Sequence, residues 1–136
     1  MIFCGAFSKN VRHEIKWRSE GRSELSGTNG ERMVCAHLNH NKKCEKYNRA
    51  DEGLYVTIFE ELAYHLLHSE EPDKIGLQKD VNDSVIRGHL GELLRKHSTD
   101  EIREKTGEAI GLWEEYLQEK KKQDIYPRVH FEGFED

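Results

Sequence analysis

The chain has 136 residues, with 21 Lys and Arg against 26 Asp and Glu, which gives a net charge of −5 at pH 7. This length supports one core, and we find no apolar run near the roughly 20 residues of a membrane span. The short apolar start at residues 1–7 does not fit a secretory signal, and three cysteines without a Cys-x-x-Cys pair disfavour a disulfide framework. We therefore expect a reducing, cytoplasmic location with no membrane partner.

Charge is distributed unevenly along the chain. Residues 1–49 carry 10 Lys and Arg and 5 Asp and Glu, a net of +5, whereas residues 50–136 carry 11 and 21, a net of −10. A basic segment can meet phosphates while an acidic remainder favours solubility. Charge alone favours the plainer interpretation, an ordinary solvated surface.

The first 36 residues predict a short helix, a turn and a strand. Ser8 is typical of an N-cap and opens a helix to about Arg18. The tight-turn pair Asn29-Gly30 separates a short extended stretch at residues 24–26 from a strand at residues 32–36.

A second strand and three helices follow. After an irregular polar stretch, residues 53–57 are β-branched and aromatic, as in a strand. Thr57 and Glu60 form a capping box that opens a helix to about Ser69. A second helix is expected from about residue 78 to 96. A second capping box, Ser98 with Glu101, opens a third helix to about residue 122. The expected fold class is α+β: a short β-hairpin plus a helix, within a mostly helical domain that has long C-terminal helices.

The helix after the second strand has one narrow polar stripe. At about 100° per residue, His65 lies about 40° from Glu61 and His68 about 20° from it on the other side, while the apolar residues occupy the opposite face. Side chains at i and i+4 are close enough to hold one cation together.

A second polar cluster, His37, Asn39 and His40, follows the first strand. If the two strands pair and the helix packs across them, this cluster can face the helix stripe. An imidazole can then take a proton from water while a cation stabilises a phosphate and the departing oxygen. This combination favours phosphodiester hydrolysis.

An ordered set of segments resembles the core of an HNH endonuclease across roughly residues 8–94. The segments are Gly21-Arg22-Ser23-Glu24-Leu25-Ser26-Gly27, Cys35-Ala36-His37-Leu38-Asn39-His40, Tyr47-Asn48, Asp51-Glu52-Gly53-Leu54-Tyr55-Val56-Thr57 and Glu60-Glu61-Leu62-Ala63-Tyr64-His65. The resemblance implies a ββα-metal finger over residues 1–97 that cuts or nicks double-stranded DNA with one divalent ion, Mg, Mn or Zn. Small nucleases of this kind are typical of phages and mobile elements.

Carried over position by position, the resemblance makes His37 the general base and Glu61 and His65 the metal ligands. The chain departs from the family pattern at three places. Ala36 stands where a metal-binding Asp or His is common, Glu52 stands where an Asn is common, and Glu61 stands where a His is common. These departures keep open an alternative, a catalytically degenerate module that binds DNA or a protein without cutting.

Basic side chains flank the expected site on both sides in the sequence. The candidates for DNA contact are Arg22, His40, Lys42, Lys43 and Arg49, with Arg12, Lys16 and Arg18 as further phosphate contacts. The plainer interpretation is that these basic side chains are exposed to solvent and bind nothing.

Two other possibilities concern the cysteines and the C-terminal part. Cys35-x-His37-x2-His40-x3-Cys44 offers the right ligand types for a compact zinc site, although its spacing is unusual. Residues 98–136 form a helix and an acidic, aromatic tail that could join two copies, so Trp113 and Leu117 are expected in the core or in a homodimer contact.

Overall fold

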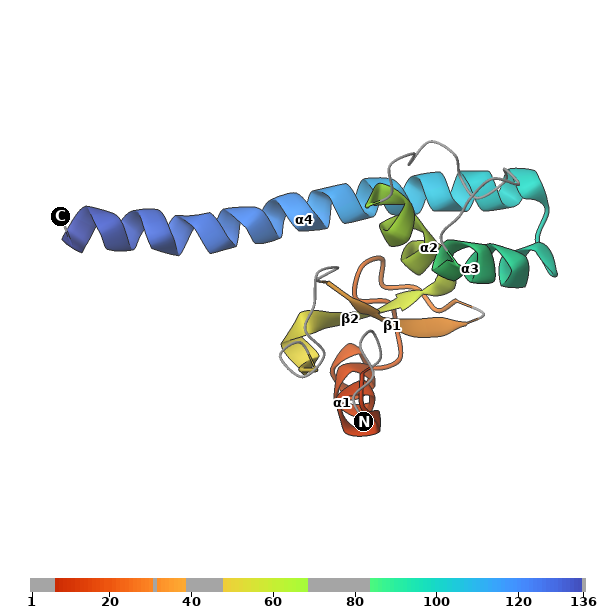
Figure 1. Ribbon diagram of the computed structural model, residues 1–136, viewed down its shortest axis with the longest axis horizontal. Helices are drawn as coiled ribbons and strands as arrows, with labels where there is room; N and C mark the ends of the chain where they lie inside the picture. The colour runs from red at the N-terminus through yellow and green to blue at the C-terminus, as the bar shows by residue number, and fades with distance from the viewer. Residues whose placement is uncertain (1–6, 31, 39–47, 69–83, 136) are drawn as a thin grey trace.

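The computed structural model describes residues 7–30, 32–38, 48–68 and 84–135, with residues 123–135 described by their backbone alone. A two-stranded antiparallel hairpin lies between helix α1 on one side and helices α2, α3 and α4 on the other (Figure 1). The fold class predicted from the sequence, α+β with a hairpin followed by a helix in a mostly helical chain, is confirmed. No helix among the described residues is long and apolar enough to cross a membrane.

Helix α1 (Lys9–Ser19) begins at the predicted N-cap, where the Ser8 hydroxyl accepts a hydrogen bond from the Val11 amide at 3.3 Å. The helix ends at Glu20, which adopts a left-handed conformation with φ of 57°. Arg18 fastens the helix to the hairpin, because its guanidinium donates to both carboxylate oxygens of Glu24 and to the Gly53 carbonyl.

Residues 24–26 form a turn, so the predicted extended stretch is wrong. The cause is the buried hydroxyl of Ser23, which accepts hydrogen bonds from the Leu25 and Ser26 amides, both at 3.0 Å. The Gly27 amide then donates to the Ser23 carbonyl at 2.8 Å, and Gly27 takes a φ of 78° that favours glycine. A serine-centred turn therefore replaces a strand here.

The hairpin pairs β1 (Met33–His37) with β2 (Gly53–Thr57), in a register that sets His37 opposite Gly53. Strand β2 has the predicted bounds, while β1 begins and ends one residue later than predicted. A short 3-10 helix, η1 (Ala50–Glu52), leads into β2. Since side chains alternate across a sheet, Ala36 and Val56 lie on the face that packs against α2 and α4, and His37 lies on the other face.

Helix α2 (Ile58–Leu67) follows β2 without a break because the capping box is complete. The Thr57 hydroxyl accepts from the Glu60 amide at 3.2 Å, and the Glu60 carboxylate accepts from the Thr57 amide at 2.8 Å. The helix ends at Leu67, two residues before the predicted end, and its C-cap is His68, whose Nδ1 lies 2.9 Å from the Tyr64 carbonyl oxygen.

Helices α3 (Ser84–Leu94) and α4 (Thr99–Glu135) complete the fold. The predicted start of the second helix, near residue 78, lies outside the described residues. Helix α4 continues past the predicted end at residue 122. Its predicted capping box is only half formed, since Ser98 accepts from the Glu101 amide but the Glu101 carboxylate contacts His97 at 2.7 Å instead.

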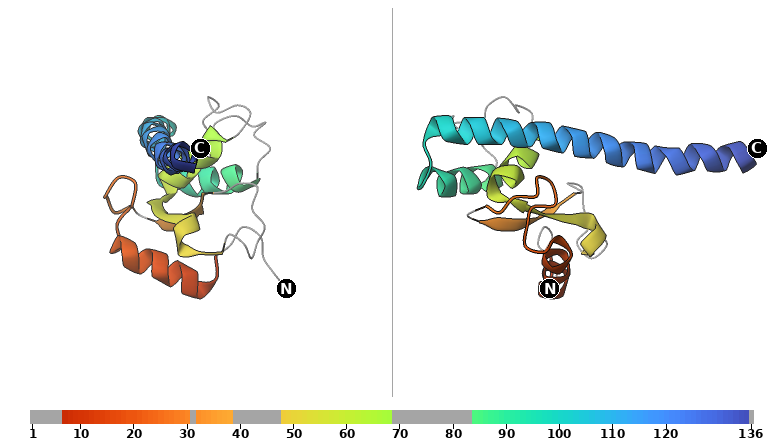
Figure 2. Two further views of the ribbon diagram at one scale, coloured as in Figure 1. Left: turned by 90° about the vertical axis from the view of Figure 1, so that its left-hand side faces the viewer. Right: turned by 180° about the vertical axis from the view of Figure 1, so that it is seen from behind.

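One helical stripe of α4 joins the core formed by the hairpin and α2. The stripe consists of Ile102, Thr106, Ala109 and Trp113, all nearly inaccessible to solvent. The indole Nε1 of Trp113 donates to the Glu60 carbonyl at 2.7 Å. The division of the chain at residue 97 stays a prediction, although the parts on either side of it share this core (Figure 2).

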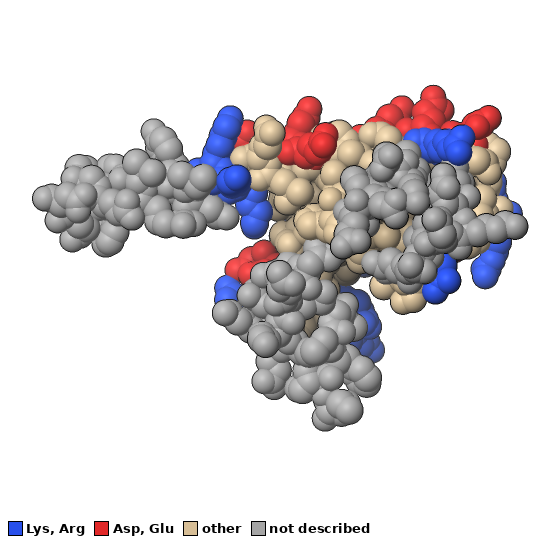
Figure 3. Space-filling view, turned by 45° about the horizontal axis from the view of Figure 1, so that its top comes forward, with Lys and Arg blue, Asp and Glu red and all other residues tan. Residues whose placement is uncertain are grey.

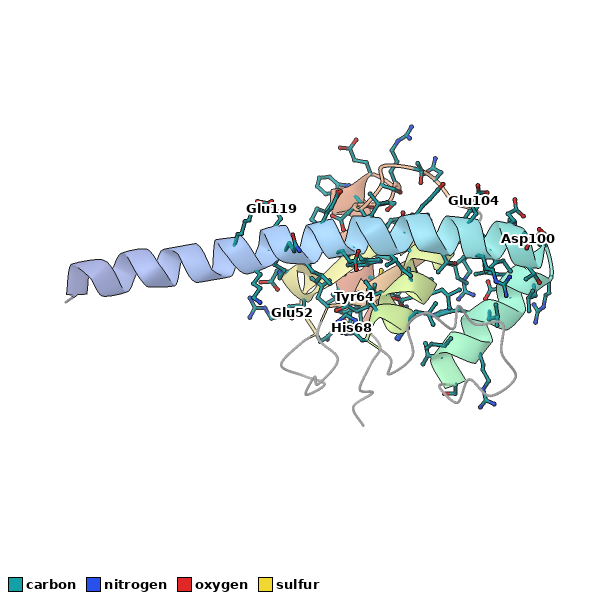
Figure 4. All side chains as sticks on the ribbon, turned by 90° about the horizontal axis from the view of Figure 1, so that it is seen from above. Glu52, Tyr64, His68, Asp100, Glu104 and Glu119 are labelled. Atoms are coloured by element: carbon teal, nitrogen blue, oxygen red, sulfur yellow. The ribbon has the colours of Figure 1, made fainter. Side chains whose placement is uncertain are left out.

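The opposite face of α4 is acidic and exposed (Figure 3). Glu104 and Glu119 project from this helix into solvent, whereas Tyr64 and His68 lie side by side on α2 with ring centroids 4.4 Å apart (Figure 4).

Candidate functional site

Glu61 and His65 lie next to each other on α2, as the spacing of the polar stripe predicts. The Nε2 atom of His65 is 3.9 Å from a carboxylate oxygen of Glu61, and the two side chains are 20% and 12% exposed. Both are therefore largely buried yet still reachable from solvent. The third member of the stripe, His68, turns instead towards the Tyr64 carbonyl at the end of the helix.

A third side chain, His89 of α3, completes a group that the sequence analysis missed. One ligand atom each from Glu61, His65 and His89 lie within 4.8 Å of one another, and the rings of the two histidines have centroids 5.8 Å apart. Helix α3 buries Ile86, Leu90 and Leu93, and His89 borders this stripe at the junction with α2. The signal in the sequence that could have found His89 is its place at the edge of the apolar stripe of the next helix.

This group could hold a metal ion. Two atoms bound tetrahedrally to one zinc at about 2.1 Å lie roughly 3.4 Å apart. The separations here, 3.9 Å for one pair and 4.8 Å at most, exceed that value by about 1.4 Å at most. Two imidazoles and one carboxylate also leave a tetrahedral ion with a fourth position for water or substrate, as in catalytic zinc sites.

His37 lies on the face of the hairpin that α1 covers, and its ring is stacked on Phe7. The two ring centroids are 3.6 Å apart with an angle of 10° between the planes, and Phe7 is only 4% exposed. Ala36, the preceding residue, is fully buried in the core with Ala63 and Tyr64 of α2. In HNH proteins the residue before the general base is commonly a metal ligand. In this chain that residue is Ala36, which packs in the core.

Cys35 lies on the same hairpin face as His37 and is half-buried. Burial raises the pKa of its thiol, and the nearby charges of Glu24 and Glu61 raise it further, against the opposing effect of Arg12. In the absence of a metal ion, the raised pKa favours the neutral thiol of Cys35, which is a weaker nucleophile than a thiolate.

The residues predicted to contact DNA are only partly described. Arg22 is exposed and donates to the Gly27 carbonyl at 3.4 Å, and Arg49 is exposed and paired with Asp51 at 2.7 Å. His40, Lys42 and Lys43 lie outside the described residues, as do two of the four ligands of the alternative Cys/His zinc site. Arg18, named above as a phosphate contact, is instead held by Glu24 within the protein.

Comparison of this chain with models of protein families, with curated proteins and with solved structures finds no match in any of the three. The functional interpretation therefore depends on the residues and geometry of the chain itself.

Proposed function

We propose that the chain is a metal-dependent DNA endonuclease of HNH type that hydrolyses phosphodiester bonds. The observation that carries the proposal is the approach of Glu61, His65 and His89 to within 4.8 Å of one another. The order of hairpin and helix, with ligands on the helix that follows the second strand, supports the same assignment. Zinc, manganese and magnesium are the candidate ions.

The donor set favours zinc among these ions. Imidazole nitrogen suits zinc and other late transition metals, whereas magnesium prefers an octahedral shell of oxygens and several waters. A bound ion would supply Lewis-acid stabilisation of the phosphate charge and of the departing oxygen. Glu61 contributes one negative charge to the site, so the bound ion would keep a net positive charge towards a phosphate.

His37 is proposed as the general base. A neutral imidazole can accept a proton from water, which is the role of a general base. Stacking on Phe7 covers one face of the ring and fixes its plane, while the two nitrogens lie at the ring edge. Phe7 would thus hold the base in one orientation without blocking its acceptor atom.

A second function, binding without cleavage, is favoured by one observation. Ala36 is fully buried against α2, so β1 offers no metal ligand there, and His37 lies on the face opposite Ala36. A metal held by α2 and α3 would then have a binding or structural purpose, and the basic N-terminal third would hold DNA or a protein partner.

Incubation with supercoiled plasmid discriminates between the two functions. The protein is incubated with zinc, manganese, magnesium or EDTA, alongside the variants H37A, H89A and, as a matched control, H68A. The endonuclease proposal expects metal-dependent nicking that H37A and H89A abolish and that H68A keeps. Retardation of the plasmid without nicking under every condition would overturn it in favour of the binding module.

A further inference from the structure

Helix α1 presents a tryptophan to solvent. Trp17 is 86% exposed, the highest exposure among the large apolar side chains described, and Ile15 on the opposite side of the helix is fully buried. Tryptophan is strongly buried on average, so its near-complete exposure on a well-formed helix indicates a surface that binds a ligand. The other tryptophan, Trp113, is fully buried.

The surroundings of Trp17 are charged and polar. The shallow hollow beside its indole is lined by His13, Glu14, Lys16, Arg18, Glu20 and Gly21. The hollow itself is largely apolar, and the charged groups lie around it. A nucleic-acid base needs an aromatic face with cations nearby, and the hollow provides both.

The cations lie on one flank of the indole. At about 100° per residue around α1, His13, Lys9, Lys16 and Arg12 lie at about 40°, 80°, 100° and 140° to one side of Trp17. All four side chains are exposed. Glu20, at the helix end, is the acidic residue on that flank, and Glu14 lies about 60° to the other side. The basic flank could follow a phosphate backbone while a base covers the indole.

The position of α1 in the fold supports a nucleic-acid ligand. Helix α1 lies on the other side of the hairpin from α4, whose outer face carries exposed acidic side chains (Figures 1 and 3). An anionic chain would be repelled by α4 and attracted to the α1 side. The charge distribution therefore favours binding of an anionic chain on the side of the hairpin where Trp17 is exposed.

We propose that Trp17 is a stacking platform for an unpaired nucleic-acid base, with Lys9 and Lys16 contacting the neighbouring phosphates, while Arg12 is held by the Phe7 carbonyl at 3.1 Å. The inference rests on the proposed function in taking nucleic acid as the ligand, but it requires neither metal nor cleavage. Because the π-face of any base can stack on an indole, recognition here would depend little on sequence.

Tryptophan fluorescence in EDTA tests this directly. The full chain is titrated with a short oligothymidylate and, separately, with its duplex with oligoadenylate. We expect quenching by the single strand and weaker binding of the duplex. W17A should weaken single-strand binding roughly tenfold, as the loss of one stacked base predicts. Polarisation of a labelled strand measures affinity for every variant.

Two variants serve as controls. W17F keeps an aromatic face, so it should bind within a few-fold of the wild type but show no quenching, because only the buried Trp113 then emits. L94A removes an exposed apolar side chain on α3 and should bind like the wild type.

Several results would overturn the inference. They are equal affinity of W17A and wild type, binding without quenching, the absence of binding, or loss of self-association in W17A instead of loss of nucleic-acid binding. Metal-dependent plasmid nicking together with equal affinity of W17A would leave the endonuclease standing and refute only the platform. Binding that depends on Trp17, without nicking, would support the stacking platform and refute the endonuclease.

Discussion

At the scale of single residues, Glu60 joins three parts of the fold. Its side chain accepts hydrogen bonds from the Ser23 hydroxyl at 2.6 Å and from the Thr57 amide, and its carbonyl accepts one from Trp113 of α4. The residue is 4% exposed, so its partners replace water almost completely. The capping box thus also orients α2, which carries the proposed ligands.

Removal of the buried cap should cost more than removal of the exposed one. T57A leaves the Glu60 amide without its cap and should lower the free energy of unfolding by about 1–2 kcal/mol, while S98A, at the half-formed box of α4, should lower it by about 0.5–1 kcal/mol. Urea denaturation measures both. Equal losses, or a larger loss for S98A, would contradict this account of the box.

Tyr64 gives the protein a sensitivity to alkaline pH. Its hydroxyl donates to the Leu38 carbonyl at 2.6 Å, and burial, with the added charge of Glu61, raises the pKa of its hydroxyl well above 10. A pKa raised in the folded state contributes stability below the unfolded pKa of about 10, and this contribution is lost as the pH rises from there towards the folded pKa. At neutral pH, Y64F should cost about 1 kcal/mol.

The pH dependence separates this effect from general alkaline unfolding. The difference in free energy of unfolding between wild type and Y64F should be constant from pH 7 to about pH 9.5 and shrink above pH 10. Urea midpoints across this range measure it. A constant difference up to pH 11 would show that Tyr64 ionises equally easily in both states.

At the scale of elements, the hairpin depends on a glycine for its contact with the N-terminal residues. A Cβ at Gly53 would lie 2.5 Å from Phe7 Cζ and 3.1 Å from the Ala36 carbonyl oxygen. G53A should therefore displace Phe7 from the ring of His37 and destabilise the fold by about 1–3 kcal/mol. The exposed helical Gly107 has open space at its Cβ, so G107A should instead stabilise the fold by up to about 1 kcal/mol.

Urea denaturation and the chemical shifts of the His37 ring protons test this pair. The ring current of Phe7 shifts those protons in the wild type, and G53A should remove the shift while G107A keeps it. Unchanged His37 shifts in G53A would show that the stack is not held by the space at Gly53.

Local patterns predicted the elements that depend on local chemistry. Strand β2, the capping box of α2 and the N-cap of α1 follow from adjacent residues, and so does the pairing of Glu61 with His65. The turn at residues 24–26 was missed because it is built on the buried Ser23 hydroxyl. The half-formed box at Ser98 was missed because His97 competes for the Glu101 carboxylate.

Only the part of the candidate site that lies on a single helix could be predicted from the sequence. His89 lies 24 positions after His65, and only the packing of α3 on α2 brings the two rings together. The side of the hairpin on which His37 lies also depends on strand register, which the spacing of motifs leaves open.

At the scale of the whole molecule, the candidate metal site bridges α2 and α3. An ion that binds only the folded chain stabilises it, by about 2.7 kcal/mol at a free concentration 100-fold above its Kd. Zinc should therefore raise the melting temperature of the wild type and of H68A but leave that of H89A unchanged. An equal rise in H89A would place the ion elsewhere.

The uneven distribution of charge over the surface is also a property of the whole molecule. Acidic residues on the outer face of α4 and cations on α1 lie on opposite sides of the hairpin, so an anionic chain is attracted to the α1 side more than to the outer face of α4. A homodimer through the C-terminal part of α4 stays a proposal alongside this one.

The most direct test of the account is an anomalous-scattering map at the zinc absorption edge, from a crystal of the full chain soaked in zinc. The account predicts one strong peak about 2 Å from Glu61, His65 and His89 together. A map without a peak there, or a peak bound by other side chains only, would contradict it.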